Sequence, residues 1–174
     1  MADAGTPALR RLLESEALPR LGHDGATIAD LRSVASPSAT SYAARVVTAR
    51  LGDGTTLRLF LKDFGSSRLF KEGADERRAR ELHVYRDLLP GAELGVPAFY
   101  GALWSEEEGR FWMALELVEG TPVADREFEA WPAATAWLAR LQGLYGRDPE
   151  RFDRSPLLAR HDAEFFASDR KSVV

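Results

Sequence analysis

The 174-residue sequence contains no cysteine, which excludes disulfide bonds, thiolate metal sites and a cysteine nucleophile. Its three histidines are scattered, and this argues against a zinc site. No stretch approaches the roughly 18 consecutive apolar residues that a membrane-spanning helix needs. Residues 1–6 lack the basic and apolar segments that begin a signal peptide, so we expect a cytoplasmic protein without a membrane partner.

Basic residues are not in excess. The chain has 23 lysines and arginines against 27 aspartates and glutamates, and the resulting net charge of −4 argues against general nucleic-acid binding. Hydrophobic residues make up 45% of the sequence, which is enough for a buried core. At this length we expect one domain, or one domain and part of a second.

The first part of the chain predicts one helix and one β-hairpin. Thr6, followed by proline, suits the cap and first turn of a helix, and the leucines after it extend the helix to about Ala17. Two runs, Tyr42 to Leu51 and Leu57 to Phe64, read as strands. The segment Gly52-Asp53-Gly54 between them is a hairpin signal.

A helix and two further strands complete the predicted sheet. The helix spans Ala74 to Leu89, and the strands span Pro97 to Trp104 and Phe111 to Val118. Four strands with one packed helix define an α+β fold with an antiparallel sheet. Beyond them, helical spacing predicts a helix from Trp131 to Tyr145 and another that starts at Ser155.

One carboxylate of the predicted helix lies in an apolar stripe. Glu81 shares helical spacing with Val84, Tyr85 and Leu88. It needs a cationic partner, because an unpaired buried charge is costly, and Lys62 at the end of a predicted strand can supply one. Taken singly, Lys62 also fits a solvated lysine at a strand end, and Glu81 also fits a surface pair with an arginine of its own helix.

The order of these motifs resembles the aminoglycoside phosphotransferase-like family, within the protein-kinase-like fold. The resemblance covers about residues 42 to 141. It implies a kinase-like nucleotide-binding lobe, made of an antiparallel sheet and one packed helix, followed by the first helices of a helical lobe. The matching segments are Leu59-Phe60-Leu61-Lys62-Asp63, Arg80 to Pro90, Gly95-Val96-Pro97 with Tyr100-Gly101, Leu115 to Gly120, and Trp137 to Gln142.

The resemblance also implies a ligand and residue roles. The cofactor would be ATP, with Mg²⁺ in the complete enzyme, and the partner would be a small-molecule acceptor such as a sugar or an aminoglycoside. Lys62 would contact the α- and β-phosphates, and Glu81 would orient it. The backbone of Glu116, Leu117 and Val118 would form the hinge that reads the adenine edge.

The loop expected to cover the phosphates departs from the family pattern. Residues 36–41 contain no glycine, so close backbone approach to phosphate is harder there. The hydroxyls of Ser38, Thr40 and Ser41 could take its place. Phe60, two residues before the lysine, stands where a small residue often floors the adenine, and its bulk would narrow that pocket.

The resemblance divides the chain into an N-terminal helical segment (residues 1–31), the ATP-binding lobe (32–120) and the start of a helical lobe (121–168). In the family, the catalytic Asp and Asn and a metal-binding Asp follow the helix predicted from Ser155. We therefore expect the N-terminal portion of a phosphotransferase, with no catalytic residue, no metal ligand and no turnover of its own. Residues 169–174 match one reading frame of a common sequencing adapter, and we expect this tail to be non-native.

Two other interpretations stay open. The chain could be a short pseudokinase-like module that binds a nucleotide or a partner without catalysis, or an unrelated α+β fold whose Lys–Glu pair is structural. Asp63-Phe64-Gly65 spells a metal-binding tripeptide of kinases, but it precedes the helix glutamate, and strand alternation points Asp63 away from Lys62. His161-Asp162 lacks the rest of a catalytic loop, so we interpret it as part of a packed helix.

Overall fold

A computed structural model describes residues 6–37, 42–67, 73–121, 123–150 and 155–158 of the chain. The chain divides into two compact units, Met1–Glu127 and Phe128–Val174, and each is described by itself. Several predictions fall outside the described residues. They are the roles of Ser38, Thr40 and Ser41, the helical assignment of His161-Asp162, and the non-native tail at 169–174.

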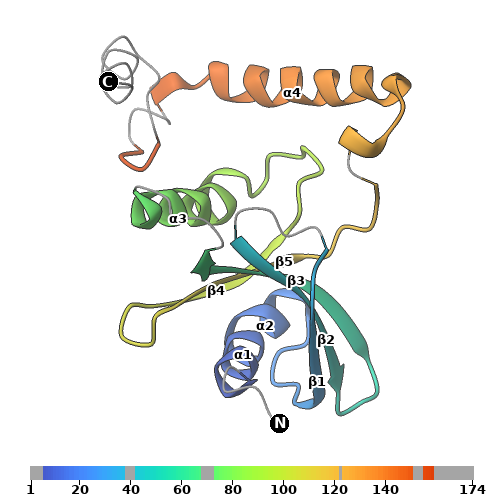
Figure 1. Ribbon diagram of the computed structural model, residues 1–174, viewed down its shortest axis with the longest axis vertical. Coiled ribbons are helices and arrows are strands. Elements are labelled where there is room, and N and C mark those ends of the chain that lie inside the picture. Colours follow the sequence, from blue (N-terminus) through green and yellow to red (C-terminus); the bar gives the residue numbers. More distant parts are fainter. Residues whose placement is uncertain (1–5, 38–41, 68–72, 122, 151–154, 159–174) are drawn as a thin grey trace. The chain divides into compact units, whose positions relative to one another are not determined.

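The first unit is built on a five-stranded antiparallel sheet, so the predicted α+β class is confirmed (Figure 1). The strands follow the order β1-β2-β3-β5-β4, which places β3 in the middle. Their bounds are β1 Ile28–Ala35, β2 Tyr42–Leu51, β3 Thr56–Ser67, β4 Phe99–Ser105 and β5 Arg110–Glu116.

The hairpin between β2 and β3 forms as predicted. The N–H of Leu51 donates to the carbonyl of Thr55 at 2.8 Å, and Gly54 adopts a φ of +90° that favours glycine. The Asp53 carboxylate accepts from the N–H of Thr55 at 2.8 Å, which lowers the pKa of Asp53. This turn fixes the register in which Ala44 of β2 lies opposite Lys62 of β3.

Strand β1 was not predicted. Ile28 and the residues after it pair with β2 along its length, but the strand lies at an edge of the sheet and only Ile28 in it is buried. An edge strand needs little apolar alternation, so its sequence resembles a loop. The expected boundary between residues 31 and 32 falls inside this strand.

The N-terminal helices cover one face of the sheet (Figure 1). They are α1 Thr6–Leu12, the π-helical segment η1 Leu13–Ala17, and α2 Leu18–Arg20. Apolar side chains of these helices share a core with β1, β2, β3 and β5. This core contains the nearly inaccessible Leu12 of α1, Val47 of β2 and Leu59 of β3. The helical segment and the sheet are therefore parts of one hydrophobic core.

Helix α3, Ala74–His83, contributes to a second core on the opposite face of β3 and β5. It continues as the π-helical segment η2 Val84–Leu88, so the predicted helix from 74 to 89 is confirmed in extent. Leu82 packs there with Met113 and Leu115 of β5. The alternation of β3 thus sends Leu59 and Leu61 into the first core and Phe60 and Phe64 toward the second.

A short 3₁₀ turn, η3 Val123–Asp125, closes the first unit. The second unit contains the 3₁₀ turn η4 Phe128–Ala130 and helix α4 Trp131–Gly146, which begins and ends close to its prediction. Of the helix predicted from Ser155, the described residues show a turn in which Leu158 N–H donates to Ser155 O at 3.2 Å. Within the described ranges, no helix combines the length and apolar character that crossing a membrane requires.

Candidate functional site

Lys62 stands near the middle of the sheet, and its ammonium faces the side on which α3 packs. Its Cα pairs with Ala44 of β2 and with Met113 of β5. Because side chains alternate along a strand, its neighbours Leu61 and Asp63 project to the other face. A strand paired on both sides holds a charged group more precisely than a loop does.

The Nζ of Lys62 donates a hydrogen bond to Oε1 of Glu81 and forms an ion pair with it. The predicted strand–helix pair is therefore present. The two side chains keep 23% and 29% of their exposure, so the pair is mostly desolvated. The nearby Arg78, which is one of the two helix arginines that could pair with Glu81 on the surface, forms an ion pair with Asp75 at 3.1 Å.

Two aromatic rings lie near the Lys62 ammonium. Nζ lies 5.6 Å from the centroid of the Tyr42 ring and 5.2 Å from that of Phe64, both within the range of cation–π attraction. On the helix, burial raises the pKa of the Tyr85 hydroxyl, and the charge of Glu81 raises it further. Tyr85 therefore stays neutral beside the pair at physiological pH.

Glu116 is the last residue of β5, and it contacts Ala98, the residue just before β4. Its N–H donates to the carbonyl of Ala98 at 2.8 Å, and its Oε2 accepts from the N–H of Ala98 at 3.1 Å. The carboxylate thus takes the place that the main-chain carbonyl of Glu116 would occupy in a continuing ladder. Leu117 and Val118 follow outside the paired register, and Val118 is 62% exposed.

Phe60 lies on the same face of β3 as Lys62, partly buried against the second core. Its Cα pairs with Val46 on one side and with Leu115 on the other. The Phe60 ring packs against residues of the second core, and these contacts fill the space around it.

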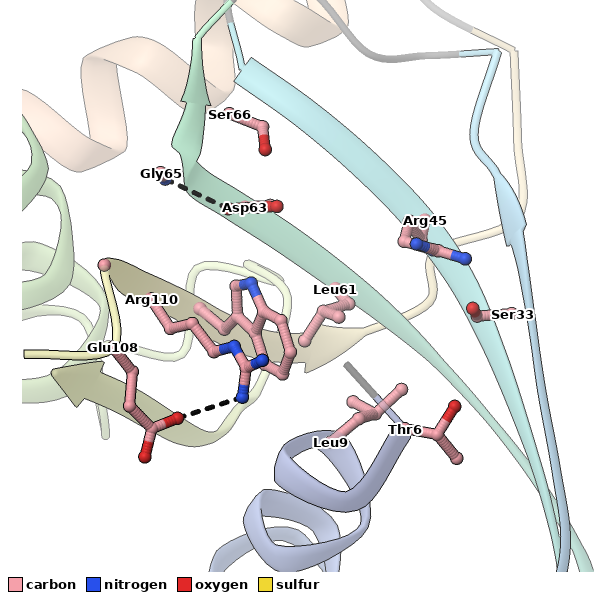
Figure 2. A pocket seen from close by; sticks show the side chains of 12 residues that line it. Thr6, Leu9, Ser33, Arg45, Leu61, Asp63, Gly65, Ser66, Glu108 and Arg110 are labelled. Atoms are coloured by element: carbon pink, nitrogen blue, oxygen red, sulfur yellow. Dashed lines mark hydrogen bonds and ion pairs between the residues drawn. The ribbon is translucent and has the colours of Figure 1, made fainter. Parts of the chain in front are cut away.

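A cavity of about 360 Å³ opens on the other face of β3, beside the start of α1 (Figure 2). Asp63 lines it together with Arg45 and Arg110, so the strand alternation predicted for Asp63 is confirmed. Arg110 is already bonded to Glu108 at 2.9 Å, and the Asp63 carboxylate accepts from the N–H of Gly65 at 3.0 Å. The cavity is therefore lined by charges of both signs that already take part in hydrogen bonds, and this lining does not favour a polyanion.

The Asp63-Phe64-Gly65 tripeptide has a packing explanation. A Cβ on Gly65 would lie 2.8 Å from the carbonyl oxygen of Gly109, so glycine allows the turn between β4 and β5 to approach β3. Phe64 belongs to the second core. A second cavity, of about 530 Å³, lies along the loop between η2 and β4, and neither Lys62 nor Glu81 lines either cavity.

Comparisons with protein-family models, with curated proteins and with solved structures found no match. Among the described residues, no group of three or more His, Asp or Glu side chains is arranged to hold a metal ion. The candidate site is thus defined by its own geometry: Lys62, Glu81 and the rings around them, with Glu116 on the adjacent strand.

Sequence reasoning found the ion pair and missed the rings beside it. Phe64 could have been found, because a residue two positions after Lys62 in a strand shares its face. Tyr42 could not, since it reaches Lys62 through an irregular pairing at the start of β2, where Tyr42 lies opposite Ser67 and the register then shifts.

Proposed function

We propose that the first unit binds the polyphosphate of ATP at Lys62, as the nucleotide-binding portion of an ATP-dependent small-molecule phosphotransferase. The observation that carries the proposal is the ion pair between Lys62 in the middle of the sheet and Glu81 on α3. A lysine ammonium is a compact charge that suits phosphate oxygens, and a carboxylate partner limits where it can go.

The chemistry of Lys62 supports an anionic ligand. An ammonium carries three N–H donors, and within the described part of the chain the Lys62 ammonium donates to Glu81. The rings of Tyr42 and Phe64 attract the charge through their faces and hold no lone pair for a strong hydrogen bond. Donors of Lys62 are therefore left for phosphate oxygens.

The position of Glu116 supports binding of a base farther along the same sheet. Glu116 lies three residues along β5 from Met113, the partner of Lys62, which is about 10 Å along a strand. That span suits a nucleoside with its first phosphates. Because the Glu116 carboxylate holds the N–H of Ala98, the Glu116 carbonyl can accept a hydrogen bond from an amino group of a base.

Reaction chemistry follows from the ligand class. The γ-phosphoryl of ATP would pass to a hydroxyl of a sugar, an aminoglycoside or a similar metabolite, with Mg²⁺ arriving on the nucleotide. Such transfer depends mainly on positioning and on neutralising charge, and Lys62 would supply part of both. We assign no residue as base or metal ligand.

Titration calorimetry with Mg²⁺-ATP tests the proposal. Lys62→Met should weaken binding by at least about tenfold, because hydrogen bonds to charged groups are worth roughly 1.5–3 kcal/mol. Lys71→Met removes the same charge elsewhere in the sequence and serves as the matched control. Equal affinity of the wild type and Lys62→Met, or no affinity in the wild type, would contradict nucleotide binding at this site.

A protein partner is a second candidate, favoured by the second unit considered alone. Helix α4 has Arg140 as its one charged residue, and none of its residues is buried. Trp131, Leu138 and Leu144 each keep more than 40% of their exposure. Exposed apolar side chains on one helix mark an interaction surface or cause aggregation. Light scattering separates the two, since a binding module gives a monomer or one defined oligomer.

A further inference from the structure

Four aromatic side chains form a continuous row across the α3 side of the sheet. Consecutive ring centroids lie 5.0 Å apart for Tyr42 and Phe64, 5.7 Å for Phe64 and Trp104, and 5.3 Å for Trp104 and Phe111. The rings meet edge to face or tilted, which is the favourable geometry for aromatic pairs. We call these four residues the aromatic row.

A cation lies at each end of the aromatic row. The Lys62 ammonium sits 5.6 Å and 5.2 Å from the first two ring centroids, those of Tyr42 and Phe64. At the far end, the guanidinium carbon of Arg78 lies 3.4 Å from the centroid of Phe111, a distance typical of direct stacking. The Arg78 side chain is only 16% exposed, so this contact is shielded from water.

Helix α3 provides a second connection between Lys62 and Arg78, in addition to the aromatic row. Arg78 precedes Glu81 by three residues, which places both on one side of the helix. Glu81 in turn pairs with Lys62. The helix is therefore attached to the sheet at two points one turn apart, by a stacked guanidinium and by an ion pair.

We infer that the aromatic row positions both members of the ion pair for phosphate binding, with Tyr42 and Phe64 acting on Lys62 and with Phe111 acting through Arg78 on Glu81. This inference rests on the proposed binding of ATP. Ring faces hold the ammonium in place without consuming its hydrogen-bond donors, unlike a second carboxylate, which would neutralise the charge. The stacked Arg78 fixes the turn of α3 from which Glu81 projects.

Two substitution pairs test the inference. Phe64→Leu keeps an apolar side chain but removes the ring, and Phe64→Tyr restores the ring. Arg78→Leu removes the stacked guanidinium, and Arg77→Leu removes an exposed charge one residue earlier on the same helix. Near-ultraviolet circular dichroism establishes that each variant is folded before it is measured.

The first readout does not require a nucleotide. Because the chain contains only Lys62, Lys71 and Lys171, selective ¹³C-lysine labelling gives three ε-CH₂ signals. Ring currents should place the Lys62 signal upfield of the other two. Phe64→Leu should move it toward them, and Phe64→Tyr should leave it upfield. Arg78→Leu should shift it, whereas Arg77→Leu should not.

The second readout is the affinity for Mg²⁺-ATP. Phe64→Leu and Arg78→Leu should each weaken binding about threefold to tenfold, while Phe64→Tyr and Arg77→Leu should stay within about twofold of the wild type. Unchanged Lys62 signals and affinities in Phe64→Leu, or equal effects of the two arginine variants, would overturn the inference. If the wild type binds no ATP, the proposed function fails. The Lys62 signal in Arg78→Leu, which keeps both rings beside the ammonium, then decides whether the stacked guanidinium positions the pair.

Discussion

The energy of the Lys62–Glu81 pair can be measured by a double-mutant cycle, with Lys62→Met, Glu81→Gln and the double variant. Exposed pairs contribute about 0–1 kcal/mol, and breaking a fully buried pair costs about 3–5 kcal/mol. Since the two side chains keep 23% and 29% of their exposure, the pair lies between these limits. We expect a coupling free energy of about 1–2 kcal/mol.

The two single variants should lower the free energy of unfolding by different amounts, because they leave different groups without a partner. Lys62→Met leaves a carboxylate without its cation and should lower the free energy of unfolding by about 1–2 kcal/mol. Glu81→Gln keeps a hydrogen-bond acceptor for the ammonium and should cost about 1 kcal/mol or less. The double variant replaces an ion pair by a neutral pair, so its cost should be smaller than the sum of the two.

Urea unfolding followed by tryptophan fluorescence gives the four free energies, and repeating the cycle at high salt sharpens the result. A mostly desolvated pair is screened weakly, so the coupling should persist in 0.5 M sodium chloride, a concentration at which a surface pair is largely screened (Debye length about 4 Å). A coupling below about 0.3 kcal/mol, or one that vanishes in salt, would refute the reasoning. The pair would then be an ordinary surface contact.

Two further predictions concern stability. At Gly101, where φ is +154°, an added Cβ would lie 2.5 Å from Cβ of Glu16. Gly101→Ala should therefore lower the free energy of unfolding of the first unit in urea by about 1–3 kcal/mol, and a loss below about 0.5 kcal/mol would contradict the packing. Asp87 has a pKa lowered to about 2, chiefly by its hydrogen bond from Arg86. Its stabilising effect is therefore present above pH 4 and lost as the pH falls toward 2, so Asp87→Asn should flatten the pH dependence of unfolding in that window; unchanged steepness would contradict it.

The parts of the fold that the sequence predicts are those with a local physical signal. The β2–β3 hairpin has alternating apolar residues around Asp53-Gly54, and α3 has an apolar stripe and a Pro90-Gly91 stop. Strand β1 has neither, because its one buried residue is Ile28 and pairing with β2 supplies the rest of its stabilisation. Long-range pairing of this kind leaves little trace in local composition.

The same distinction holds for the candidate site. A charged residue in an apolar stripe demands a partner, so Glu81 and Lys62 could be matched without a structure. The stacking of Arg78 on Phe111 could not be predicted, since it joins residues far apart in the sequence through the tilt of a helix on a sheet. Which cation meets which ring is decided by tertiary packing.

The hairpin turn at Gly52–Gly54 has a consequence for insertions and deletions. It sets the register of β3, and one residue added between Thr56 and Lys62 would turn the ammonium toward the α1 side and bring Leu61 to the place beside Glu81. Two added residues would restore the face but displace the lysine by about 7 Å along the strand. The length of the chain between the turn and Lys62 therefore sets where the charge lies, and we expect this stretch to tolerate no insertion or deletion of one residue.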